Sequence, residues 1–97
     1  MIVPSGKQQE SGPFARALSA EVRAILARQR ITVKRLAEDA GMSPTYLGKR
    51  LRDEASLTLN DVEAICQALG EDLQSFVNSA IERGDDGPVT RSLPRIQ

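Results

Sequence analysis

Hydrophobic residues recur three and four positions apart along most of the chain, a spacing that places side chains on one face of an α-helix. This pattern predicts five helices, over residues 13–30, 32–41, 44–52, 58–70 and 72–84. No alternation of apolar and polar residues predicts a strand, and no internal repeat is present. The expected fold is therefore all-α, with five helices around one core. The residues expected to face that core are Phe14, Leu18, Val22, Ile25, Leu26, Leu36, Ala37, Ala40, Leu47, Leu51, Val62, Ile65, Cys66, Leu69, Leu73, Phe76, Val77, Ala80 and Ile81.

Local signals mark the ends of these helices. Serine followed by proline at 43–44 indicates a helix start, because serine caps free N–H groups and proline suits the first helical position. Thr58 and Asp61 have the spacing of a capping box. The start of the first helix stays open, since either Ser11 or Ser19 is placed to cap it. The remaining expected caps and stops are Thr32, Gly41, Gly70, Asp72 and Gly84.

A chain of 97 residues is expected to hold one domain with a modest core. Aromatic residues are few, so that core must be built from leucine, isoleucine, valine and alanine. The two terminal segments carry glycine, proline and polar residues without helical spacing. The predicted organisation is a flexible arm over residues 1–12, a helical domain over 13–84 and a flexible tail over 85–97.

Composition argues against several classes of function. The chain has no histidine, and a lone cysteine, Cys66, forms neither an intramolecular disulfide nor a multi-cysteine metal site. No enzyme, metal or cofactor is expected, because the chain has no glycine-rich phosphate loop and the paired carboxylates Asp85 and Asp86 lie in the tail. No apolar run approaches the ~18 residues that span a bilayer, and residues 1–12 lack the apolar part of a secretion signal. A cytoplasmic protein is expected.

The formal net charge is zero, but the charges are unevenly distributed along the chain. Residues 21–52 carry eight basic side chains against three acidic ones, whereas residues 53–88 carry nine acidic side chains against one basic one. Because phosphates respond to the local potential, a basic face attracts DNA even on a neutral protein. The distribution favours a nucleic-acid partner over an ordinary scatter of solvated charge.

Residues 32–51 carry the pattern that points most directly to a function. Gly41 permits a sharp turn between two short helices, and Ala37 is small enough for those helices to cross closely. Leu47 and Leu51 lock the second of these helices against the rest of the domain. Its other side stays free, and such a helix fits the DNA major groove with its first residues at base edges.

The facing of this helix selects candidate contacts. At about 100° per residue, Leu47 and Leu51 define its buried direction, and Thr45 and Lys49 point nearly opposite. Threonine bonds a base or touches a thymine methyl and lysine bonds guanine, so both are expected to contact bases. Gly48 lacks a side chain, which allows close approach to DNA or to the neighbouring helix. The residues expected to contact phosphates are Tyr46, Arg50 and Arg52, the helix starts Thr32 and Ser43, and the nearby Lys34 and Arg35.

This helix pair resembles the helix-turn-helix of the Cro/C1 (XRE-type) repressor family, and the similarity covers residues 22–76. The resemblance implies a five-helix, lambda-repressor-like domain that binds operator DNA, often as a dimer. A phage immunity repressor or a Cro-like protein fits it. The matching residues are Leu36, Ala37, Gly41, Met42, Ser43, Leu47, the helix from Thr58 to Leu69, and Gly70. The base-reading role of the family's third helix carries over to Pro44, Thr45, Gly48 and Lys49.

Two features depart from the family pattern. The family usually has glutamine just after the cap of the second helix, where it touches a phosphate, and this chain has Val33. The loop after the third helix is commonly basic and contains glycine, whereas residues 53–56 here read Asp-Glu-Ala-Ser. Two carboxylates near a DNA backbone repel it unless they point away.

A repressor that occupies an operator is the expected role, because the chain is too short to hold a sensor or activation domain as well. Half-sites ~34 Å apart favour a homodimer on DNA. Apolar residues of the fifth helix either form the dimer contact or merely close the core; they are Leu73, Val77, Ala80 and Ile81. The alternative function is an antitoxin or protein-binding adaptor, with residues 84–97 holding a partner protein through Val89, Leu93 and Ile96.

Overall fold

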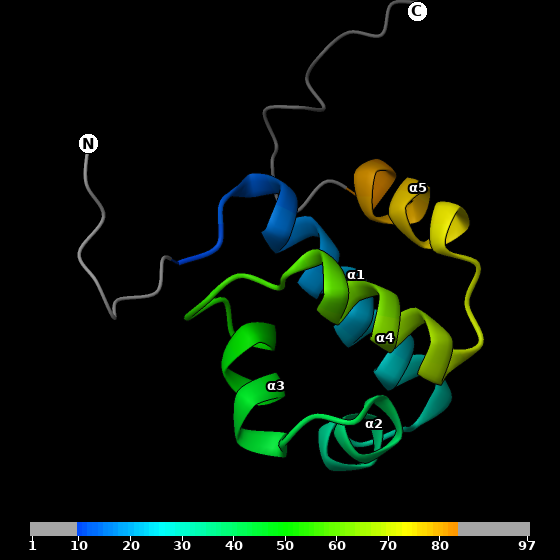
Figure 1. Cartoon of the computed structure of the whole chain (residues 1–97). Coiled ribbons are helices and arrows are strands. Elements are labelled where there is room, and N and C mark those ends of the chain that lie inside the picture. The colour runs from blue at the N-terminus through cyan, green and yellow to red at the C-terminus, as the bar shows by residue number, and fades with distance from the viewer. Residues whose placement is uncertain (1–9, 84–97) are drawn as a thin grey trace, which may run out of the picture.

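The computed structural model describes residues 10–83, which form five helices (Figure 1). Their bounds are α1 (Pro13–Gln29), α2 (Val33–Ala40), α3 (Pro44–Leu51), α4 (Leu59–Leu69) and α5 (Leu73–Arg83). The expected all-α fold is confirmed, because residues 10–83 contain no strand. The predicted tail, the predicted stop at Gly84 and residues 1–9 of the predicted arm lie outside the described residues.

The helices pack around α1, which contacts both α3 and α5. Helix α2 packs against α3 and α4, and α4 also contacts α5. In Figure 1, α3 and α5 lie at opposite sides of the fold, with α1 and α4 between them. This arrangement turns the outer side of α3 away from α5. None of the described helices is both long enough and apolar enough to cross a membrane.

One core joins the inner faces of the helices, and Phe76 and Ile25 are its largest fully buried side chains. Three residues predicted to face the core are instead substantially exposed: Phe14 at 52%, Leu73 at 44% and Ile81 at 57%. They lie in the first turn of α1 and in the first and last turns of α5. A helical repeat predicts a face, but a terminal turn extends beyond the neighbours that would cover that face.

Side-chain caps begin four of the five helices. Thr32 and Ser43 start α2 and α3, and each hydroxyl oxygen accepts a backbone N–H hydrogen bond at 3.0 Å. Thr58 and Asp61 form the predicted capping box of α4. The carboxylate of Asp72 accepts a backbone N–H hydrogen bond at 2.9 Å at the start of α5. These local signals place the start of each of these four helices as the sequence predicts.

Helix α1 starts differently. Its N-cap is Gly12 and no side chain caps it, so the expectation of a serine cap from Ser11 or Ser19 is wrong. Proline at the first helical position has no N–H that needs a partner, which reduces the need for a cap. Ser11 is buried, and its backbone N–H donates to the carbonyl oxygen of Asp53 at 3.3 Å. Packing therefore begins two residues before Pro13, where the domain was predicted to start.

Cys66 lies in the core on α4, as its position on the apolar face predicts. Burial, with a smaller effect from the nearby carboxylates Glu71 and Asp72, raises the pKa of its thiol to about 11. At pH 8, we expect the native protein to react with a thiol reagent at least about a hundred times more slowly than the chain unfolded in urea, because the thiolate is the reactive form. Timed labelling with and without urea measures this. Equal rates would show that the thiol is accessible in the fold.

Candidate nucleic-acid interface

A tight turn joins α2 to α3. Gly41 has φ +76° and ψ +30°, in the left-handed region that residues with a Cβ rarely adopt. Two backbone hydrogen bonds close α2, from the Gly41 N–H to the Glu38 carbonyl at 3.2 Å and from the Met42 N–H to the Ala37 carbonyl at 2.9 Å. Ala37 is completely buried, which lets α2 and α3 pack closely. The predicted helix-turn-helix is therefore present.

The two sides of α3 differ in exposure. Leu47 and Leu51 are buried and fix the inner side, as predicted. Among the described residues, no ion pair includes Lys49, and no side-chain hydrogen bond includes Thr45 or Lys49. Both side chains are therefore available to a ligand lying along α3. Of the four predicted base contacts, three are exposed, namely Pro44, Thr45 and Lys49, and Gly48 is half-buried.

Tyr46 and Arg50 turn inward, which corrects their predicted place among the phosphate contacts. The Tyr46 hydroxyl donates to the carboxylate of Asp61, with oxygens 3.0 and 2.9 Å away. The guanidinium carbon of Arg50 lies 4.1 Å from the centre of the Tyr46 ring, and Nη1 donates to the Ser56 carbonyl at 2.9 Å. Only 8% of Arg50 is exposed. Because α4 brings Asp61 beside α3, both side chains bend toward it and away from the outer side.

Tyr46, Arg50 and Asp61 form what we call the Asp61 cluster. Besides the tyrosine hydroxyl, the carboxylate accepts the backbone N–H of Thr58 at 2.9 Å and lies 3.7 Å from Nε of Arg50. The side chains of Arg50 and Asp61 are each only 10% exposed. Burial raises the pKa of the Tyr46 hydroxyl, and the hydrogen bond to Asp61 raises it further by a smaller amount. The phenol therefore stays a neutral donor. The cluster fixes α3 against the start of α4.

Four other predicted phosphate contacts lie on exposed surface at the starts of α2 and α3. Thr32 and Ser43 are exposed, although their hydroxyl oxygens already accept the capping hydrogen bonds. Lys34 takes part in no ion pair among the described residues, whereas Arg35 pairs with Asp39 at 3.2 Å. Both ends of that pair are largely exposed, so water screens it and a phosphate can compete for the arginine.

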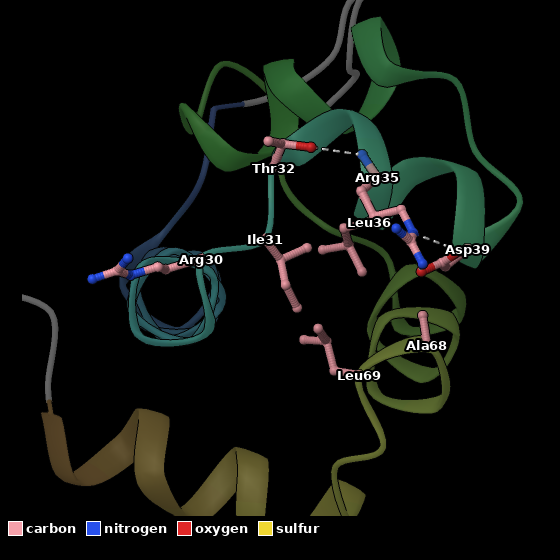
Figure 2. A pocket seen from close by; sticks show the side chains of 8 residues that line it. All are labelled: Arg30, Ile31, Thr32, Arg35, Leu36, Asp39, Ala68 and Leu69. Atoms are coloured by element: carbon pink, nitrogen blue, oxygen red, sulfur yellow. Dashed lines mark hydrogen bonds and ion pairs between the residues drawn. The ribbon is translucent and has the colours of Figure 1, made fainter.

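A pocket of about 300 Å³ lies beside Arg35, where the C-terminal end of α1 meets helices α2 and α4 (Figure 2). Apolar side chains form its floor, and the Arg35–Asp39 pair lies at its rim. The chain turns sharply beside it, since Arg30 ends α1 with φ +58°. The pocket is therefore a surface hollow where α1 passes into α2. Its lining residues are Arg30, Ile31, Thr32, Arg35, Leu36, Asp39, Ala68 and Leu69.

The two acidic residues after α3 face different directions. Asp53 has a left-handed φ of +64°; Ser19 donates to its Oδ1 at 2.8 Å and Arg23 lies 3.6 Å from its Oδ2. This carboxylate is only 15% exposed and faces α1. Glu54 is exposed and pairs with Arg52, with Nε 2.8 Å from Oε2. Of the two carboxylates expected to repel DNA, that of Asp53 points toward α1 and that of Glu54 forms an ion pair with Arg52.

The Helix-turn-helix (HTH_3) family model matches residues 22–76, which is more than half of the chain. The chain belongs to this family. Two crystal structures of the clp gene regulator ClgR from Corynebacterium glutamicum are similar to it. One is 26% identical with a TM-score of 0.68, covering 75% of this chain and 95% of that chain. The other is 25% identical with a TM-score of 0.72, covering 88% and 89%. A comparison with curated proteins found no match.

Membership of the Helix-turn-helix family confirms the XRE-type resemblance and makes the chain a DNA-binding transcriptional regulator. In this regulator, Val33 packs against the core at the position where the family usually has a polar glutamine. The glutamine contact is therefore absent, and the groups at the start of α2 that remain able to bind a phosphate are Thr32, Lys34 and the free N–H groups of the first turn.

Proposed function

We propose that this regulator is a sequence-specific repressor that occupies an operator by placing α3 in the major groove. The observation that carries the proposal is the outer side of α3, where Thr45 and Lys49 are exposed and bound by no other described side chain. Threonine and lysine suit base edges. Lys34, Arg35 and the N–H groups that begin α2 and α3 suit phosphates and hold the register.

Repression requires only that the protein occupies its operator. Residues 10–83 form a single helix-turn-helix domain, and such a domain bound within a promoter excludes polymerase by its volume. The alternative of an antitoxin or adaptor depends on residues 84–97, which lie outside the described residues, and no described feature favours it.

Selection of bound sites from random double-stranded DNA by the full chain tests this proposal. The expected motif has two related half-sites about 10 base pairs apart. Placed between the promoter elements of a reporter, it should lower expression; placed far upstream, it should leave expression unchanged. Failure to select any motif would reject sequence-specific binding, and higher expression from the upstream site would reject the repressor role.

We place the dimer contact on the outer flank of α5. Leu73 and Ile81 are exposed there, with the half-buried Val77 between them. Ala80, predicted as a fourth contact, is completely buried and belongs to the core, because the neighbouring face of α5 packs against α1. An apolar flank of this kind suits a symmetric contact with the same flank of a second copy.

Replacing Ile81 with aspartate should weaken binding to an operator with two half-sites by about tenfold or more, because a carboxylate would enter an apolar contact. Affinity for a single half-site should not change, since Ile81 is 57% exposed and α5 lies on the opposite side of the fold from α3 (Figure 1). Ser79→Asp is the matched control, because Ser79 is exposed on the opposite flank of α5. Equal effects of the two substitutions would place the dimer contact elsewhere.

A further inference from the structure

Arg52, which ends α3, folds its side chain back along the outer side of the helix. A Cβ built at Gly48 would lie only 3.2 Å from Nη1 of Arg52. The guanidinium therefore packs next to the space that a side chain at position 48 would need. At about 100° per residue, Arg52 points within about 20° of Thr45 and about 60° of Lys49. The arginine therefore shares the surface that holds the two exposed base-contact candidates.

Glu54 accepts a hydrogen bond from the Nε edge of this guanidinium. Its Oε2 lies 2.8 Å from Nε of Arg52, and no other described group bonds to the arginine side chain. The side chains of Arg52 and Glu54 are 60% and 51% exposed, so the pair contributes little to stability. Hydrogen bonding to Glu54 raises the pKa of Arg52, and the same bond lowers the pKa of Glu54. The pair's effect is to orient a charged side chain while leaving Nη1 and Nη2 available.

A guanidinium with both Nη groups available presents two parallel N–H donors, which match N7 and O6 at the major-groove edge of guanine. We propose that Arg52 reads a guanine in each half-site, with Glu54 as its positioning residue and Gly48 as the clearance that lets it lie along α3. This inference rests on the proposed function, since it requires α3 in the major groove. It replaces the sequence-based expectation that Arg52 contacts a phosphate, and it gives the acidic loop after α3 a use in recognition.

The Arg52→Ala variant tests the base contact. The wild-type chain is first used to select its motif, and both proteins are then titrated against that site and against sites with each base pair changed. Loss of about tenfold or more in discrimination at one G·C pair per half-site, with the other positions unaffected, is the expected result. Equal weakening on every sequence would make Arg52 a phosphate contact and overturn the inference, as would unchanged binding. If the wild-type chain selects no motif, the proposed function itself fails.

Gly48→Ala tests the clearance without touching the arginine. Alanine favours a helix over glycine, so the melting temperature should hold or rise, while the new Cβ, 3.2 Å from Nη1, makes the Arg52 guanidinium shift by a few tenths of an ångström from its orientation along α3. Discrimination at the same G·C pair should fall in the Arg52 protein and change no further in the Arg52→Ala protein. An equal loss in both backgrounds would show that alanine meets DNA directly, and clearance for Arg52 would be rejected.

Glu54→Ala removes both the acceptor that orients Arg52 and a negative charge beside it. Removal of a carboxylate near DNA should strengthen binding to scrambled sequences, while loss of orientation should reduce discrimination at the G·C pair. These opposite changes distinguish a positioning residue from one that merely supports the fold, which would alter both affinities in the same direction. Unchanged discrimination with stronger overall binding would show that Glu54 does not position Arg52.

Discussion

Replacing Asp61 with alanine is expected to lower the free energy of unfolding by about 3–5 kcal/mol. The substitution leaves the cation of Arg50 in a site that is only 10% exposed, without the carboxylate 3.7 Å away. It also removes the acceptor of the Tyr46 hydroxyl and one half of the capping box that starts α4. Small domains are stable by only about 5–15 kcal/mol, so the substitution should remove a large share of the total stability and lower the melting temperature. Urea unfolding followed by circular dichroism measures the loss.

Two further variants show whether the Asp61 cluster is responsible. Glu63→Ala removes an exposed carboxylate from the same helix and should change stability by no more than about 0.5 kcal/mol. Replacing Arg50 with methionine in the Asp61→Ala protein removes the unpaired cation and should restore part of the stability. A similar, small loss for Asp61→Ala and Glu63→Ala would show that the cluster contributes little.

The double substitution Thr45→Ala and Lys49→Ala should reduce the difference in binding free energy between the selected operator and a scrambled duplex by about 2–6 kcal/mol. Each base contact contributes about 1–3 kcal/mol of discrimination, and losses at separate positions add approximately. Both side chains are exposed, so the fold and its melting temperature should be preserved. Competition binding with both duplexes measures the effect.

Lys34→Ala is the matched control for that double substitution. Lys34 is an exposed cation near the start of α2 and is expected to contact a phosphate. Its loss should weaken binding to both duplexes alike and reduce the slope of affinity against salt concentration by about one. If the double variant keeps its preference for the operator, the bases are read from another surface.

The predictions that succeeded concern neighbours in the sequence. A cap such as Ser43 acts on a backbone group three residues away, and Gly41 acts on its own φ angle, so a short window of sequence contains the physics that places these helix ends. The inward facing of Leu47 and the outward facing of Thr45 also follow from the helical repeat alone. Most of the helix-turn-helix could therefore be predicted before any coordinates.

The corrections concern partners that the chain brings together only on folding. Arg50 and Tyr46 lie on the flanks of α3, where the helical repeat allows either direction, and Asp61 on α4 decides it. The contact of Asp53 with Ser19 spans 34 residues, and no local sequence pattern predicts it. Ala80 moved from a candidate dimer contact to the core for the same reason, since only packing against α1 selects the buried flank of α5.

The contact of Ser11 with Asp53 has a practical consequence for the experiments above. It places the beginning of the described chain beside the end of α3, whereas α5 ends at Arg83 against Glu21 of α1. An affinity tag or a surface linkage attached ahead of Ser11 would crowd the edge of α3 that we propose to meet DNA. Immobilisation through the end that follows α5 keeps the support matrix away from the bound duplex.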